Sequence, residues 1–265
     1  MKKQQRDSPH GRAKRSLGQH FLMDEFAIST IVNAVAGGAT AFEIGPGRGA
    51  ITNQLRARTS HLLLIEKDDA LAAHWQRQAA TDSHLQLVHG DVLVVLEEQL
   101  TRYHPQWIVG NLPYNISGPL TALLVARNLP GGMVLMYQSE VAERIAAEPG
   151  CGRSCGGISV ISRYCWQIER LITLPPEAFD PPPKVESAVL RFTPNGTTFC
   201  STTFTALQWC VRRGFAHRRK TLANNFRDLC DDTLWQQTAI DPSLRPERLS
   251  MTQWLTLAEA LQQRE

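Results

Sequence analysis

The sequence predicts an α/β protein in which a mostly parallel, doubly wound sheet is followed by a small all-helical domain. Short apolar runs alternate with helical patterns, a glycine-rich loop joins the first such run to a helix, and the pattern becomes purely helical after the turn at Pro194. With 265 residues, 43% of them apolar, the chain can bury one large core and a second small one. We therefore expect a flexible basic arm at residues 1–15, a sheet domain at residues 16–195 and a helical domain at residues 196–265.

The sheet is expected to begin with a strand, a glycine loop and a helix. Gly45, Gly47 and Gly49 directly follow the apolar strand at residues 39–44. In a doubly wound sheet a ligand binds beyond the carboxyl ends of the strands, and glycine lets the backbone approach that ligand closely. The spacing differs from the Gly-x-Gly-x-x-Gly of dinucleotide sites, and an acid, Glu43, lies two residues before the first glycine. This pattern favours a cationic ligand over a pyrophosphate, although the loop taken alone is equally typical of a tight turn.

The next two strands also lead into acids. Residues 61–65 are followed by Glu66, about twenty residues after the loop, where an acid can bind both hydroxyls of a ribose. Residues 85–89 lead through a glycine to Asp91, which is suited to an adenine amine. With Glu43, these carboxylates would surround a positively charged, adenosine-bearing ligand, and S-adenosylmethionine fits that description better than NAD or ATP. Acids at strand ends are also ordinary helix caps, so the argument depends on their order along the chain.

A fourth apolar run, which begins at Trp107, ends in the tetrad Asn111-Leu112-Pro113-Tyr114. An exocyclic base amine is a poor nucleophile because its lone pair is delocalised into the ring. A site that methylates it must accept its N–H hydrogens and hold its ring in place, and Asn111 and Tyr114 can do these two things. Asn-x-Pro is also a common turn signal. The loop, the two acids and the tetrad nevertheless end four successive strands, which predicts a methyltransferase acting on a planar amine.

The remaining elements complete the sheet and the helical domain. A fifth parallel strand is expected at residues 133–137, and a final hairpin at 168–174 and 187–192 makes the sheet mixed. Helices are expected at residues 69–80, 119–127, 139–147, 158–166, 204–215, 221–229 and 252–261. The loop at residues 148–157 carries two cysteines and has no functional interpretation.

Four segments, in the same order, make the chain similar to the small-subunit ribosomal RNA adenine dimethyltransferases, the family of the bacterial kasugamycin-sensitivity enzyme. They are residues 16–22 (Ser-Leu-Gly-Gln-His-Phe-Leu), 43–47, 111–117 and 175–189. The resemblance covers nearly the whole chain. It implies a Rossmann-like, S-adenosylmethionine-dependent methyltransferase that dimethylates N6 of two adjacent adenines near the 3′ end of 16S rRNA, within an immature 30S subunit.

The resemblance also assigns roles to individual residues. The expected cofactor contacts are His20, Leu22, Glu43, Gly45, Gly47, Glu66, Asp91 and Asn111. The target adenine would be flipped out or single-stranded and would stack between Tyr114 and Phe179. Its N6 hydrogens would be accepted by the Asn111 side-chain oxygen and the Leu112 carbonyl, which directs the lone pair toward the methyl group.

The expected RNA contacts are basic residues in two segments. The arm at residues 1–15, which ends at Arg15, carries six basic residues against one acid, while the net charge of the chain is +3. The second segment, residues 212–220, has five basic residues and no acid, and it includes Arg218, Arg219 and Lys220. Either segment could be a solvated surface. An RNA substrate favours phosphate contact instead, since each neutralised phosphate adds salt-dependent affinity.

Cysteine spacing and hydropathy indicate the cellular compartment in which the protein is expected. The six cysteines lack the paired spacing of zinc sites and are expected to be free thiols, so no metal is predicted. The chain has no long apolar run, and its charged beginning is not followed by the apolar segment of a secretory signal. We expect a cytoplasmic protein that does not bind a membrane, and nothing in the sequence requires more than a monomer.

Three alternatives remain open from the sequence. The erythromycin-resistance group shares the fold and methylates a 23S rRNA adenine, but its tetrad commonly has Ile where Leu112 stands. Methylases of protein glutamine or DNA adenine usually carry a second proline at that position. A third alternative is a ribosome-assembly factor, or a transcription factor descended from these enzymes, in which binding matters more than catalysis.

Overall fold

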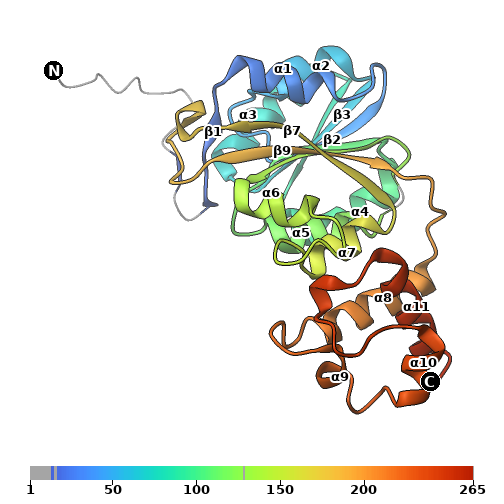
Figure 1. Ribbon diagram of the computed structural model, residues 1–265. Helices are drawn as coiled ribbons and strands as arrows, with labels where there is room; N and C mark the ends of the chain where they lie inside the picture. The colour runs from blue at the N-terminus through green and yellow to red at the C-terminus, as the bar shows by residue number, and fades with distance from the viewer. Residues whose placement is uncertain (1–12, 15–16, 128, 265) are drawn as a thin grey trace. The chain divides into compact units, whose positions relative to one another are not determined.

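The computed structural model describes residues 13–14, 17–127 and 129–264, which form two compact units (Figure 1). Unit 1 comprises the chain up to Leu120 together with residues 129–142 and 169–193. Unit 2 comprises residues 121–128, 143–168 and 194–265. Unit 2 thus contains more of the chain than the helical domain expected from the sequence, and the boundary at residue 195 stays a prediction.

Within the described residues, seven strands form one sheet in the order β4-β3-β2-β5-β6-β9-β7. They are β2 (Thr40–Ile44), β3 (His61–Glu66), β4 (Leu85–His89), β5 (Trp107–Asn111), β6 (Gly132–Gln138), β7 (Trp166–Leu174) and β9 (Ser187–Pro194). Strands β2 to β6 pair in parallel, and β9 runs antiparallel to β6. The predicted α/β fold with a mixed sheet is confirmed.

The register of the parallel strands brings their carboxyl ends to one edge of the sheet. Ile44 pairs with Ile65 on one side and with Gly110 on the other, while Glu66 pairs with His89. Residues that follow these strands therefore emerge next to one another. The glycine loop, the acids and the tetrad, far apart in sequence, meet at this edge as expected for a doubly wound sheet.

Helices cover both faces of the sheet. They are α1 (Glu25–Asn33), α2 (Thr52–Arg58), α3 (Asp69–Ala79), α4 (Val92–Tyr103), α5 (Ser117–Leu124) and α6 (Ser139–Ala146). Helices α1, α2 and α3 lie on one face and α4 lies on the other (Figure 1). Asp68 caps α3 by accepting hydrogen bonds from the amides of Ala70 and Leu71, and Asp91 caps α4 through the amide of Leu93.

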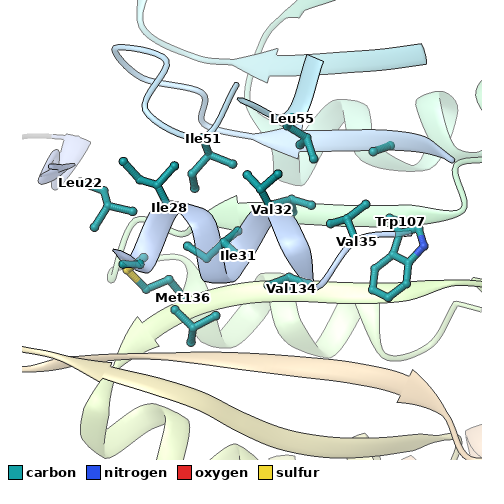
Figure 2. Packing of buried hydrophobic residues seen from close by; sticks show 14 of the residues in the cluster. Leu22, Ile28, Ile31, Val32, Val35, Ile51, Leu55, Trp107, Val134 and Met136 are labelled. Atoms are coloured by element: carbon teal, nitrogen blue, oxygen red, sulfur yellow. The ribbon is translucent and has the colours of Figure 1, made fainter. Parts of the chain in front are cut away.

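The core of unit 1 fixes the position of α1 and of the segment before it. Ile28, Ile31 and Val32 recur at helical spacing on the buried face of α1, in the same apolar cluster as Val134 and Met136 of β6 (Figure 2). Burial of each such side chain contributes about 1.5–3 kcal/mol. The segment that precedes α1 forms β1 (Phe21–Leu22), which pairs antiparallel with β8 (Phe179–Asp180).

Unit 2 is built mainly from helices. They are α7 (Gly157–Arg163), α8 (Ser201–Gly214), α9 (Leu222–Asn225), α10 (Asp232–Thr238) and α11 (Met251–Gln262). Trp254 of α11 is fully buried and stacks on Phe215, with ring centroids 5.6 Å apart. A Cβ atom at Gly214 would lie 2.5 Å from the Trp254 ring, so glycine is required there for α8 and α11 to pack closely.

Two predicted helices are shorter than expected. The helix predicted at residues 158–166 ends at Arg163, and Trp166 begins strand β7, whose first residues alternate between buried and exposed. The sequence prediction was wrong because the local apolar pattern did not reveal that the Trp166 indole is buried. The helix predicted at residues 221–229 stops at Asn225, after which the chain continues in turns.

Candidate active site

Unit 1 contains a cavity at the carboxyl edge of the sheet. Its wall is built from the segment before β1, the glycine loop after β2, the ends of β3 and β5, and the turn after β4. Eight residues predicted from the sequence line it together: His20, Gly45, Gly47, Glu66, Asp91, Asn111, Leu112 and Tyr114. Leu22, Glu43 and Phe179 are not among the lining residues.

The side chain of Asn111 is oriented by the segment before β1. Its Nδ2 donates a hydrogen bond to the backbone carbonyl of His20 at 2.9 Å, and this contact distinguishes the amide nitrogen from the oxygen. Among the described residues, no donor bonds to Oδ1 of Asn111. A hydrogen-bond acceptor is therefore available at the end of β5, in the cavity wall.

The ring of Tyr114 is held at both its hydroxyl and its face. The hydroxyl forms a 2.7 Å hydrogen bond with Oγ of Ser187, and the ring stacks on His20 with centroids 5.6 Å apart and an interplanar angle of 23°. Nδ1 of His20 donates to the carbonyl of Pro181 at 2.7 Å, so the imidazole is itself fixed. Burial raises the pKa of Tyr114, and the hydrogen bond with Ser187 opposes this shift.

Glu66 receives hydrogen bonds from successive backbone amides. Its Oε1 accepts from Lys67 at 2.9 Å and from Asp68 at 2.8 Å, and its Oε2 accepts from Gly47 at 3.3 Å. Burial raises the pKa of Glu66, and these three bonds to the charged form oppose the shift. Gly47 has a φ of +55°, and a Cβ there would lie 3.1 Å from the Phe21 ring. Glycine at this position lets the loop reach the carboxylate.

Asp91 pairs with the cation of the residue that directly follows β3. Nζ of Lys67 lies 2.8 Å from Oδ2 of Asp91, and this hydrogen bond lowers the pKa of Asp91. Lys67 also lines the cavity. Arg48 likewise contacts the site, since it pairs with Asp180 at 2.8 Å and its guanidinium lies 4.2 Å from the Phe21 ring centroid. The sequence showed both cations but did not reveal these partners.

Three expected site residues are buried beside the cavity. Glu43 is 1% exposed, and burial raises its pKa to about 8, so the carboxyl is largely protonated at neutral pH. Leu22 and Phe179 face each other in the β1–β8 pair and belong to the apolar cluster. In this structure His20, and not Phe179, is the ring next to Tyr114. The predicted roles of these buried residues stay predictions.

The expected RNA contacts lie partly outside the described residues. Arg15 falls outside them, and Lys14, the one basic residue of the arm that is described, pairs with Asp68 at 2.9 Å. In unit 2, Arg218, Arg219 and Lys220 are exposed in the turn that follows α8.

The described residues contain no cluster of His, Cys, Asp or Glu that could hold a metal ion. In the same part of the chain, no helix is both long enough and apolar enough to cross a bilayer. The six cysteines are free thiols.

The chemistry of the cavity fits a cationic, adenosine-bearing cofactor. Glu66 and Asp91 present carboxylates at the ends of neighbouring strands, and glycines leave the loop backbone open between them. On the other side of β2 in the sheet, the end of β5 carries the Asn111 acceptor and leads to the ring of Tyr114. A bound molecule could therefore meet acids at one end and an amide oxygen at the other.

Comparisons with known proteins agree with this geometry. A family model described as ribosomal RNA adenine dimethylase matches residues 10–263. Ribosomal RNA small subunit methyltransferase A of Laribacter hongkongensis is 39% identical over 249 residues, 92% of this chain and 94% of the relative. The protein of the same name from Xanthomonas campestris pv. campestris is 40% identical over 250 residues, 93% and 95% of the two chains.

Solved structures show the same fold at lower identity. A dimethyladenosine transferase from Plasmodium falciparum has a TM-score of 0.76 at 21% identity, covering 90% of this chain and 96% of that one. The 23S rRNA methyltransferase ErmE has a TM-score of 0.68 at 20% identity, covering 91% and 99%. The predicted Rossmann-like methyltransferase fold is confirmed. Because the family model spans nearly the whole sequence, the chain belongs to the ribosomal RNA adenine dimethylase family.

Proposed function

We propose that this protein transfers methyl groups from S-adenosylmethionine to N6 of two adjacent adenines near the 3′ end of 16S rRNA. The observation that carries the proposal is the Asn111 amide, which presents an unpaired oxygen beside Tyr114 in a cavity that also contains Glu66 and Asp91. The names of relatives that are 39–40% identical support the small-subunit RNA over the large-subunit RNA.

Residues of the cavity would hold the cofactor along its length. Glu66, fixed by three amides, would bind the ribose hydroxyls, and Asp91 would accept from the adenine amine. Gly45, Gly47 and His20 would surround the methionine end. When bound, S-adenosylmethionine supplies an electrophilic methyl group on a sulfonium.

The chain's own residues would bind and orient the target amine. Oδ1 of Asn111 and the carbonyl of Leu112 would accept the two N6 hydrogens, which turns the nitrogen lone pair toward the methyl group. Stacking on Tyr114 would add about 1–3 kcal/mol and fix the plane of the base. No strong base is required, because the proton on the methylated nitrogen is acidic enough to leave to solvent. Positioning and fixed dipoles would carry most of the rate enhancement.

Phe179 remains our candidate for the second face of the adenine pocket. Its ring is 2% exposed in β8, so the proposal requires the β1–β8 pair to shift when RNA binds. Leu22 faces Phe179 across this pair and would move with it. Glu43 is buried in β2, two residues before the glycine loop. It would affect cofactor binding indirectly, through the position of that loop.

We also propose the setting of the reaction. The substrate would be an immature 30S subunit in the cytoplasm, and the enzyme would act as a monomer. Arg15, Arg218, Arg219 and Lys220 would contribute to RNA binding.

The proposal is tested by incubating the protein with labelled S-adenosylmethionine and either undermethylated small subunits or naked large-subunit RNA. We expect dimethylated adenines that map to the 3′ end of the small-subunit RNA. Label confined to large-subunit RNA would assign the protein to the erythromycin-resistance group. Tight binding to small subunits with no transfer would instead favour an assembly factor.

A further inference from the structure

Strands β1 and β8, residues 21–22 and 179–180, form a two-stranded sheet of their own, here called the ribbon. Phe21 lies opposite Asp180 in it, and one further backbone bond runs from the amide of Met23 to the carbonyl of Ala178 at 2.8 Å. A two-stranded sheet of this kind is at best marginally stable by itself in water. The position of the ribbon must therefore be set by its contacts with other segments.

The two faces of the ribbon have different surroundings. Leu22 and Phe179 belong to the apolar cluster of unit 1, so this face is buried. Successive residues of a strand point to opposite faces, which places Phe21 and Asp180 on the other face. Phe21 lines the cavity, and Asp180 does not.

His20 joins the ribbon to the end of β5. Its Nδ1 donates to the carbonyl of Pro181, which directly follows β8, at 2.7 Å. Its backbone carbonyl accepts from Nδ2 of Asn111 at 2.9 Å, and its ring stacks on Tyr114. A displacement of the ribbon would therefore move the groups that orient Asn111 and Tyr114.

Arg48 joins the ribbon to the glycine loop. Its Nη1 lies 2.8 Å from Oδ2 of Asp180, and its guanidinium carbon lies 4.2 Å from the ring centroid of Phe21. One guanidinium thus contacts both strands of the ribbon at the same register position. The side chain of Arg48 is 22% exposed and that of Asp180 is 51% exposed, so solvent only partly screens the pair.

The backbone next to Arg48 is held firmly by unit 1. The amide of Gly47 donates to Oε2 of Glu66 at 3.3 Å, and the carbonyl of Gly47 accepts from Nε1 of Trp75 at 3.0 Å. These bonds connect the glycine loop to β3 and α3. Arg48 therefore extends from a fixed backbone, and its side chain can fix the ribbon in turn.

We propose that Arg48 is a positioning residue for methyl transfer, because it holds the ribbon on the glycine loop. The loop borders the methyl donor, and the ribbon, through His20, orients the acceptor Asn111 for the target amine. Arg48 thus keeps the two halves of the site in register. The inference rests on the proposed function for the identity of the reaction.

The expected effects are modest for binding and larger for catalysis. Loss of a partly exposed ion pair changes an equilibrium by up to about fivefold, so the affinity for S-adenosylhomocysteine should fall by about two- to fivefold. Methyl transfer is more sensitive to position, since a misplacement of about 1 Å can cost about 100-fold in rate. We expect kcat to fall by roughly tenfold, with less than about a twofold change in KM for small subunits.

The test uses Arg48→Met, Asp180→Asn and the double variant of the full chain. Hydrogen exchange at the amide of Met23 and at residues 178–181 should become severalfold faster in each variant. Because Asp180 does not line the cavity, its effect on kcat must be transmitted through a neighbour. The double variant should lose no more activity than Arg48→Met does alone, since both changes remove the same ion pair.

Arg191→Met is the matched control. Arg191 of β9 pairs with Glu169 of β7 at 2.6 Å, and the two side chains are 38% and 55% exposed. Neither residue lines the cavity or belongs to the ribbon. The control should therefore retain wild-type exchange at the ribbon, wild-type kcat and wild-type affinity for S-adenosylhomocysteine.

Three outcomes would overturn the proposal. They are wild-type exchange and kcat in both single variants, fully additive losses in the double variant, and weaker cofactor binding in Arg48→Met with no effect of Asp180→Asn. The last outcome would make Arg48 a direct cofactor contact. Exchange and S-adenosylhomocysteine binding are measured without methyl transfer. If both change as expected while the wild-type protein methylates no small subunit, Arg48 does hold the ribbon and the proposed function fails.

Discussion

The hydrogen bond between Tyr114 and Ser187 offers a quantitative test of how the ring of Tyr114 is held in the cavity wall. The two residues are 73 positions apart in sequence, and their hydroxyl oxygens lie 2.7 Å apart. Ser187 is 0% exposed at the start of β9, so no water can readily replace it as a partner. Tyr114→Phe and Ser187→Ala each remove the bond while the ring of residue 114 is retained.

A double-mutant cycle gives the expected magnitudes. A buried hydrogen bond contributes a net 0.5–1.5 kcal/mol, so each single change should lower the free energy of unfolding by about 1 kcal/mol. Because both changes delete the same bond, the double variant should also lose about 1 kcal/mol rather than the sum of about 2 kcal/mol. If the bond serves mainly to orient the ring, each variant should lose up to about fivefold in kcat/KM for small subunits.

The assay combines urea denaturation with initial rates of methyl transfer. Ser159→Ala is the matched control: Ser159 is also fully buried and hydrogen-bonded, to the amide of Gly156 at 2.8 Å, but it lies in unit 2. The control should lose stability and keep its kcat/KM. Additive losses of stability for Tyr114→Phe and Ser187→Ala, or wild-type rates in both, would refute the reasoning.

Three further predictions follow from the cavity. Asn111→Ala should abolish methyl transfer and weaken cofactor binding only modestly in calorimetry, because the amide oxygen is the proposed acceptor for the amine; retained dimethylation would contradict that role. Burial raises the pKa of Glu43 from 4.5 to about 8. Between these pH values the folded state retains a proton that the unfolded chain releases, so the free energy of unfolding should fall as the pH rises. Glu43→Gln should remove this part of the pH dependence in urea titrations at pH 5, 6.5 and 8, and an unaltered slope would show that another group titrates. Lys67→Met should raise the pKa of Asp91 toward its ordinary value in an NMR titration, and an unmoved pKa would mean that the ion pair is absent in solution.

Much of unit 1 could be predicted from local sequence. Strand, loop and helix succeed one another in patterns of period two and 3.6, and each acid or glycine of the site stands at the end of a strand. Once the sheet is parallel, its topology alone brings Gly47, Glu66 and Asn111 to one edge. Seven of the eight predicted residues that line the cavity end or follow the parallel strands and meet for this reason, and the eighth, His20, comes from the segment before β1.

Other features were beyond a local pattern. Trp166 begins a strand because its indole is buried and donates to the carbonyl of Val125, 41 residues away. The sequence predicted that Glu43 and Phe179 contact the cofactor and the target adenine. Neighbouring segments instead bury both side chains beside the cavity. The desolvation that raises the pKa of Glu43 and the burial of the Phe179 ring are both set by neighbours from several elements.

By itself, the sequence determined the order of elements, the family and the residues that meet at the carboxyl edge, because these depend on periodicity and on motifs that are contiguous in the chain. Only the tertiary structure decided which partner each polar group has. It joined Tyr114 to Ser187, Lys67 to Asp91, and Arg218 to a loop 63 and 65 residues earlier. Such contacts are formed when distant segments pack, so the free energy that selects them belongs to the folded chain and not to any local stretch of it.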